Sequence, residues 1–191
     1  MLKTFVLVSE VTNLSDARYC AGMGVNVLSF CVDATAESFV AAEKFKEIKG
    51  WLAGIDLYIE SQTNNIEEIL TLKNQYEADG VVISDVHLLD ELKNAGINYL
   101  LRVSDLINMG NFVADNEPVL LSIENDLSEE LESALKNQAV ILSSNLSTEQ
   151  LLELIDNETI KGIELKGGEE ERPGFTDFDT LMDILEALEV D

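Results

Sequence analysis

One stretch near the C-terminal end of the chain carries the residue types that bind oxyanions. It reads Lys166-Gly167-Gly168 and follows the apolar run Gly162–Leu165. The backbone N–H groups of a glycine turn, with a lysine and the start of a helix, can surround a phosphate or carboxylate. The acidic run Glu169–Glu171 works against an anion there. An anion site and a plain glycine turn between strand and helix therefore both remain open.

Carboxylates near the predicted strand ends are a second group that could do chemistry. Several converging carboxylates would suit Mg²⁺, Ca²⁺ or Mn²⁺. An acid beside a helix start is also favourable without a metal, because it faces the positive end of the helix dipole. With a single histidine, His87, a histidine-based metal cage is excluded, and we expect neither a metal nor a cofactor. The acids concerned are Glu10, Asp33, Glu60, Asp85, Asp105 and Glu124.

The composition is that of a globular protein with a strong acidic excess. The chain has 191 residues, 46% of them hydrophobic, and a net charge of −25. This charge repels nucleic acid and anionic membrane surfaces, so neither is an expected partner, and it slows the approach of a phosphorylated substrate. No apolar run approaches the ~18 residues of a membrane span, and the first residues do not resemble a signal peptide. Cys20 and Cys31 lie in apolar segments, so we expect both to be reduced and buried in the core. We expect a cytoplasmic protein.

Short apolar runs alternate along the chain with amphipathic stretches. The runs are rich in Val, Ile, Leu and Phe with little polar alternation, which is typical of parallel strands buried on both faces. The predicted strands are Thr4–Ser9, Val27–Cys31, Ala53–Ile59, Gly80–Ser84, Tyr99–Val103, Val119–Ile123, Ala139–Leu142 and Gly162–Leu165.

Each predicted helix follows a short polar residue that can accept from its first free N–H groups. The helices are Asp16–Gly22, Ala36–Ile48, Ile66–Tyr76, Val86–Ala95, Asp105–Phe112, Glu129–Leu135, Glu149–Ile155 and Phe178–Leu188. The corresponding caps are Asn13 or Ser15, Thr35, Asn64, Asp85, Ser104, Asp126 or Ser128, Ser147 and Thr176.

Eight strands alternating with eight helices predict a parallel sheet with right-handed crossovers. Eight units favour a closed barrel, so we predict a compact (β/α)₈ TIM barrel as a single domain over residues 1–191. The chain is just below the ~200-residue lower end of the usual size range for this fold, so its loops must be short. An open flavodoxin-like sheet is the alternative. In a barrel of this kind the functional site lies at the C-terminal ends of the strands.

Two segments resemble one known family. The segment Val6–Phe30 holds Thr12-Asn13-Leu14-Ser15-Asp16-Ala17, followed by a glycine-rich turn and the strand around Phe30. With the segment Lys161–Asp177, it resembles the first and last units of phosphoribosylanthranilate isomerase, an eight-fold β/α barrel of tryptophan biosynthesis. The resemblance implies an aldose–ketose isomerisation of the Amadori type, in which a phosphoribosyl-anthranilate becomes a carboxyphenylamino deoxyribulose phosphate. It also implies a bound phosphate.

The positions at which that family keeps its catalytic residues differ here. Ser9 stands at the position of the family's cysteine base, and Ser122 at that of its aspartate acid. A serine hydroxyl without help is far too weak an acid to replace a thiolate. Glu10, at a family glycine position, and Glu124, two residues beyond Ser122 on the same strand face, are the candidate replacements.

The binding positions are partly kept. In the family, backbone N–H groups after strands seven and eight hold the phosphate, which points to Ser144, Asn145, Lys166, Gly167 and Gly168. Arg102 replaces the lysine of strand five and could project into the barrel mouth. A surface or ion-paired arginine explains it equally well.

We therefore expect a diverged isomerase-like protein whose family activity is lost or much reduced. The alternative is a non-catalytic barrel that binds a small anionic ligand or a protein partner. An active enzyme predicts that Glu10 and Glu124 face each other across an open pocket. A non-catalytic barrel predicts a mouth closed by side chains such as Glu10 and Phe39. In either case we expect a monomer or homodimer with a small phosphorylated or carboxylated ligand.

Overall fold

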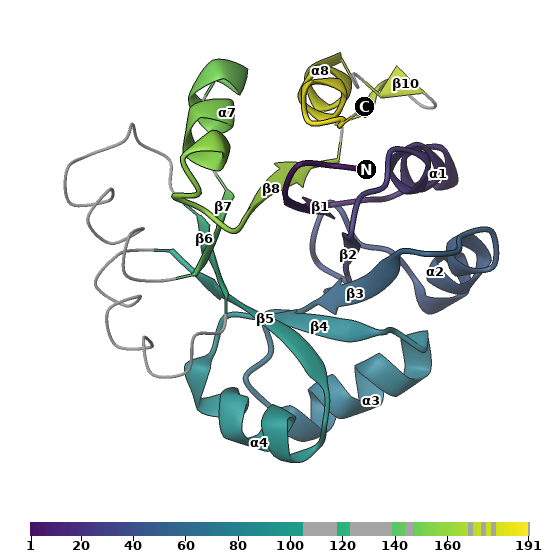
Figure 1. The fold of residues 1–191 in the computed structure, drawn as a ribbon. Coiled ribbons are helices and arrows are strands. Elements are labelled where there is room, and N and C mark those ends of the chain that lie inside the picture. Colours follow the sequence, from purple (N-terminus) through teal and green to yellow (C-terminus); the bar gives the residue numbers. More distant parts are fainter. Residues whose placement is uncertain are drawn as a thin grey trace.

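The computed structural model shows a closed barrel of eight parallel strands in the order β1 to β8 (Figure 1). The structure describes residues 1–104, 118–122, 139–143, 147–167, 170–172, 175–176 and 179–190. The predicted TIM barrel is thus confirmed. Its strands are β1 Phe5–Ser9, β2 Val27–Cys31, β3 Asp56–Glu60, β4 Gly80–Ile83, β5 Asn98–Val103, β6 Val119–Ser122, β7 Val140–Ser143 and β8 Gly162–Lys166.

The helices described lie around the outside of the strands (Figure 1). They are α1 Leu14–Gly22, α2 Ala42–Lys49, α3 Ile66–Tyr76, α4 Leu89–Asn94, α7 Thr148–Asp156 and α8 Asp179–Ala187, with a 3₁₀ turn η1 at Val86–Leu88. The helices predicted at Asp105–Phe112 and Glu129–Leu135 lie outside the described residues. None of the described helices has both the length and the apolarity needed to cross a bilayer.

Apolar side chains on both faces of the strands explain why the runs lack polar alternation. The outward faces pack against the helices, as Phe30 does against Phe45 of α2 with ring centroids 5.0 Å apart. The inward faces form a second, smaller cluster inside the barrel. This inner cluster consists of Phe5, Leu7, Val27, Tyr58, Val82, Leu100, Leu120 and Ile141.

One glycine is required by this inner packing. A Cβ atom on Gly80 of β4 would overlap the ring of Tyr58, which fills the barrel interior from the neighbouring strand. The missing side chain of β4 thus makes room for the aromatic ring of β3.

Three of the predicted helix caps are confirmed, whereas Thr176, predicted to cap the last helix, lies in the strand β10 Phe175–Thr176. The side chains of Asn13, Asp85 and Ser147 accept from backbone N–H groups at the starts of α1, η1 and α7. Ser147 also forms a reciprocal capping box with Gln150, which satisfies two free N–H groups at once. At α3 the cap is Asn65 rather than the predicted Asn64, because the Asn65 side chain is the one that reaches the free N–H groups.

The predicted helix Ala36–Ile48 was wrong at its start. Residues 36–41 do not join the helix, and Phe39 forms a parallel bridge with Cys31, the last residue of β2. The helix α2 begins at Ala42 without a side-chain cap, so Thr35 has no capping role. The segment between β2 and α2 is thus longer than predicted, because it includes strand-like pairing that a local sequence pattern does not indicate.

The two ends of the chain meet beside β1. The N–H of Lys3 donates to the carbonyl of Leu188 at 2.9 Å, and that of Val190 donates to the carbonyl of Met1 at 3.0 Å. Between β8 and α8 the structure has a two-stranded antiparallel element, β9 Glu170–Arg172 and β10 Phe175–Thr176, which the sequence analysis did not predict.

A candidate site at the barrel mouth

The mouth, formed by the C-terminal ends of the strands, is lined by polar side chains. Successive side chains of a strand alternate between faces, so residues two beyond the inner cluster point into the barrel at its mouth. In the strands described, these positions carry serine, glutamate and arginine rather than aliphatic residues. Ser84, two beyond Val82, lies past the end of β4 and is exposed, and in β8 the corresponding residue is Glu164, two beyond Gly162. We call the following set the polar layer: Ser9, Ser29, Glu60, Arg102, Ser122, Ser143 and Glu164.

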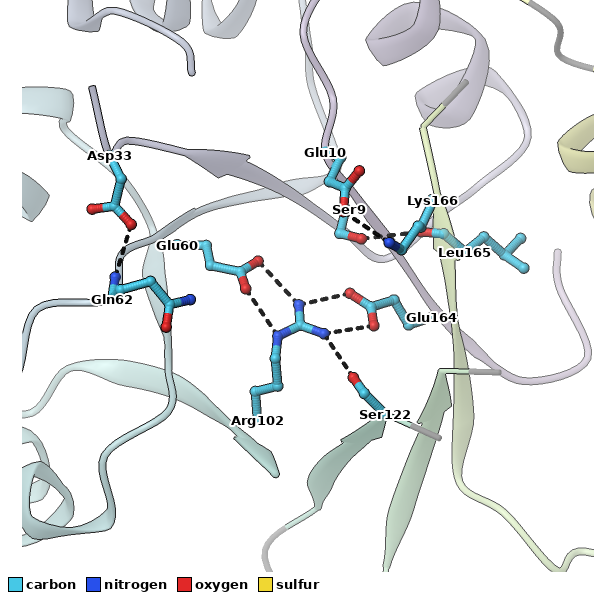
Figure 2. A network of polar contacts seen from close by, with 10 residues as sticks. All are labelled: Ser9, Glu10, Asp33, Glu60, Gln62, Arg102, Ser122, Glu164, Leu165 and Lys166. Atoms are coloured by element: carbon cyan, nitrogen blue, oxygen red, sulfur yellow. Dashed lines mark hydrogen bonds and ion pairs between the residues drawn. The ribbon is translucent and has the colours of Figure 1, made fainter. Parts of the chain in front are cut away.

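Arg102 of β5 lies at the centre of the polar layer (Figure 2). Its Nε and Nη2 donate to Glu60 of β3 at 2.9 and 3.0 Å. Its Nη1 and Nη2 donate to Glu164 of β8 at 2.8 Å each. A fifth bond, 3.1 Å long, runs from Nη1 to the hydroxyl of Ser122 in β6. A guanidinium has five N–H donors, so every donor of Arg102 has a protein acceptor.

Glu164 is the inner carboxylate of this network. Its side chain is 0% exposed. Burial alone would raise its pKa, but the bonds and charge of Arg102 outweigh burial, and the hydroxyls of Ser143 and Ser9 add to them. The pKa of Glu164 is therefore held below its ordinary value, and the group is an anion at neutral pH.

Glu60 is the outer carboxylate, with a side chain that is 18% exposed. Burial raises its pKa, and repulsion by Glu164 and Glu10 adds to this effect. Arg102 lowers the pKa but does not cancel the rise. Two glutamates thus share one cation. Their pKa values shift in opposite directions because the inner carboxylate, Glu164, also has hydroxyl donors. With both ionised, the three charged groups carry a net charge of −1.

The serines that the resemblance places at the base and acid positions both have hydrogen-bond partners within the protein. The Ser9 hydroxyl, in a residue that is 2% exposed, has two acceptors within reach, the Glu164 carboxylate and, at 3.5 Å, the carbonyl of Leu165. The Ser122 hydroxyl accepts from Arg102. Ser29 is fully buried, and its hydroxyl has no hydrogen-bond partner in the part of the chain that the structure describes.

Glu10 lies on the rim rather than inside the barrel. It is exposed, and its carboxylate pairs with Lys166 at 3.1 Å (Figure 2). Its backbone has φ 57°, the left-handed region that favours glycine, and in the family this position is a glycine. Glu124, the proposed partner of Glu10, lies outside the described residues, so their pairing stays a prediction.

The described part of the candidate phosphate loop is occupied by the protein's own backbone. The N–H of Gly167 donates to the carbonyl of Ser9 at 2.7 Å. A Cβ atom at Gly167 would lie 3.0 Å from the carbonyl oxygen of Glu10, so this glycine permits a close approach of β8 to β1. An anion held here would need donors other than this N–H. Ser144, Asn145 and Gly168 lie outside the described residues.

Four of the acidic residues considered for a metal, Glu10, Asp33, Glu60 and Asp85, are among the described residues, and Asp105 and Glu124 lie outside them. Within the described ranges, no group of three His, Cys, Asp or Glu side chains could hold a metal ion. Asp33 instead accepts from the hydroxyl of Ser61 at 2.7 Å and from the N–H of Gln62 at 2.9 Å, which joins the loops after β2 and β3.

Arg102 and Glu60 were among the residues that the sequence pointed to, whereas Glu164 and Ser143 were not predicted as site residues. A signal for Glu164 was present, because it interrupts the apolar run of β8 at an inward position. A buried carboxylate requires a cation or several donors, so an arginine at an inward position of another strand was the partner to seek. Within the described residues, Glu60 and Glu164 are carboxylates that face each other across Arg102.

Several solved phosphoribosylanthranilate isomerases are similar in structure to this barrel. A scan of family models and a search of curated proteins return no match. Among solved structures, a monomeric form of the dimeric phosphoribosylanthranilate isomerase of Thermotoga maritima is 19% identical, with a TM-score of 0.78 over 96% of this chain and 97% of that one. The isomerase of Pyrococcus furiosus is 16% identical, with a TM-score of 0.75 over 96% and 97% of the two chains.

A third structure is an isomerase in complex with reduced 1-(o-carboxyphenylamino)-1-deoxyribulose 5-phosphate. It is 19% identical, with a TM-score of 0.77 over 96% of this chain and 97% of that one. The resemblance predicted from the two terminal segments is confirmed at the level of the fold: this chain has, over nearly its whole length, the (β/α)₈ barrel of the phosphoribosylanthranilate isomerases.

Proposed function

We propose that this protein is a phosphoribosylanthranilate isomerase-like barrel in which the family reaction is lost or much reduced. The observation that carries the proposal is the network of Arg102 with Glu60, Glu164 and Ser122, which lies across the centre of the mouth. In a barrel of this type the substrate would occupy this place.

The groups present are poor replacements for a general acid and base. Proton transfer to and from a sugar needs groups whose pKa values lie near the operating pH. The hydroxyls of Ser9 and Ser122 are far from that range, and each is held by a hydrogen bond within the protein. Glu164 has a lowered pKa and no exposed surface, which disfavours a role as proton donor.

The charge of the mouth also disfavours the family's substrate. A phosphorylated anion would meet the net negative charge of Glu60, Arg102 and Glu164, with Glu10 on the rim. Lys166, the nearby cation of the strand-eight loop, is already paired with Glu10. In this proposal the protein is a monomer or homodimer without a cofactor. It binds a small phosphorylated or carboxylated ligand weakly, and any turnover of that ligand is slow.

The test is isomerase activity on phosphoribosylanthranilate generated in situ, followed by the loss of anthranilate-type fluorescence. We expect the parent to show no turnover, or a trace that Glu10→Gln and Glu124→Gln leave unchanged. A rate that falls in either variant would show a relocated acid–base pair and refute the proposal.

A restored pair provides the converse experiment. The variant Ser9→Cys/Ser122→Asp returns the family's base and acid to their positions, and we expect it to exceed the parent in activity. The matched control Ser15→Cys/Ser104→Asp makes the same replacements at two exposed serines. Equal activity of parent and both variants at a substantial rate would mean that the parent isomerises by other groups.

A further inference from the structure

The two edges of the Arg102 guanidinium face different surroundings. The Nη1–Nη2 edge faces Glu164, whose side chain is fully buried and is also supported by Ser143 and Ser9. The Nε–Nη2 edge faces Glu60, whose side chain reaches solvent and whose other charged neighbours, Glu164 and Glu10, repel it. Glu164 is therefore the fixed partner of Arg102, and Glu60 is the replaceable one.

The contact between Glu60 and Arg102 has the geometry of ligand recognition. Two nearly parallel N–H bonds of 2.9 and 3.0 Å run to the two oxygens of one carboxylate. A free carboxylate would bind this edge of a guanidinium in the same way, because the planar fork matches a planar carboxylate. Glu60 brings this group to Arg102 as part of the chain, so it competes without the entropy cost of association.

We propose that the Nε–Nη2 edge of Arg102 is a carboxylate-binding site whose resident occupant is Glu60, which acts as a built-in competitor for small carboxylate ligands. In the parent protein the site is filled and the network is negative. When the Glu60 carboxylate is absent, Arg102 and Glu164 form a neutral pair with an open bidentate edge near solvent. Glu60 is thus the residue that determines whether the mouth accepts an anion.

The variant Glu60→Ala provides a direct test, because it deletes the atoms of one acetate. We would titrate the parent and the variant with sodium acetate and with sodium chloride of equal ionic strength, and follow the midpoint of thermal unfolding by circular dichroism. Acetate should raise the midpoint of Glu60→Ala and not that of the parent, with an apparent affinity about ten- to a hundredfold higher in the variant. Chloride should not reproduce the shift.

Two controls isolate the site. Glu47→Ala deletes the same atoms from an exposed carboxylate that pairs with Lys44 on α2, and it should show no specific response to acetate. Adding Arg102→Met to Glu60→Ala should abolish the response. If Glu60→Ala is unfolded in buffer, acetate must restore its folded spectrum and chloride must not. An equal response to both salts, persistence without Arg102, or continued unfolding in acetate would overturn the proposal.

The readout is binding and not turnover, so the result is independent of whether the protein isomerises any substrate. An active isomerase with no acetate response would refute only this inference. An inactive protein that binds acetate in the Glu60→Ala form would support it.

Discussion

Replacing Arg102 by methionine tests whether one cation holds the polar layer together. Methionine keeps an unbranched chain of similar shape but donates no hydrogen bond. The change leaves Glu60 and Glu164 facing each other inside the barrel, and the Glu164 side chain has no exposed surface. Removing one partner of a buried ion pair costs about 3–5 kcal/mol, so the free energy of unfolding at pH 7 should fall by about this amount. For a chain of 191 residues, that lowers the unfolding midpoint by about 6–20 °C.

The loss should depend on pH in a defined direction. In the parent, the lowered pKa of Glu164 contributes stability that is present above its unfolded-state pKa and is lost as the pH falls through the folded-state value. The raised pKa of Glu60 acts oppositely, since its ionisation costs stability as the pH rises. Without Arg102, burial and mutual repulsion raise the pKa values of both Glu60 and Glu164. Protonation then removes the uncompensated charges, so the deficit of the variant should shrink as the pH falls from 7 toward 5.

The assay is urea unfolding of both proteins by far-ultraviolet circular dichroism at several pH values. Arg18→Met, at an exposed arginine of α1, is the matched control and should change stability little. The triple variant Arg102→Met/Glu60→Gln/Glu164→Gln should recover most of the loss, because no charged group of this network remains. A single variant within about 1 kcal/mol of the parent at pH 7, or a deficit that grows toward pH 5, would refute the reasoning.

Two backbone positions give further predictions, both measured by urea unfolding. Gly80→Ala should lower the free energy of unfolding by about 1–3 kcal/mol, because the new Cβ overlaps the Tyr58 ring. Gly22→Ala, with open space around it, should not lower it. Equal effects of the two changes would contradict the packing argument. Glu158→Gly should raise the free energy of unfolding by up to about 1 kcal/mol, because Glu158 is exposed and its φ of 54° lies in the left-handed region that favours glycine. A clear destabilisation would mean that the Glu158 carboxylate makes a contact that outweighs its backbone strain.

The fold follows largely from local sequence patterns. Apolar runs such as Val27–Cys31 must be buried on both faces, and the alternating amphipathic stretches must cover them, which leaves few architectures for eight units. Side-chain caps such as Ser147 act within one turn, so they too were readable. The error at α2 arose from strand pairing that a helix pattern does not indicate, because Phe39 bridges to Cys31 at the end of β2 and the helix begins only at Ala42.

The candidate site, too, could be predicted in part from the sequence and in part only from the structure. From the sequence we predicted that Ser9 and Ser122 stand where the resembled family has a base and an acid, and charged residues that interrupt apolar runs were visible in it. It could not determine which charges meet, because Glu60, Arg102 and Glu164 belong to three strands brought together only when the barrel closes. That every N–H donor of Arg102 is bonded to an acceptor within the protein is visible only in the folded structure. The physical reason is that a buried cation takes the nearest acceptors of matching geometry, and closure of the sheet sets which those are.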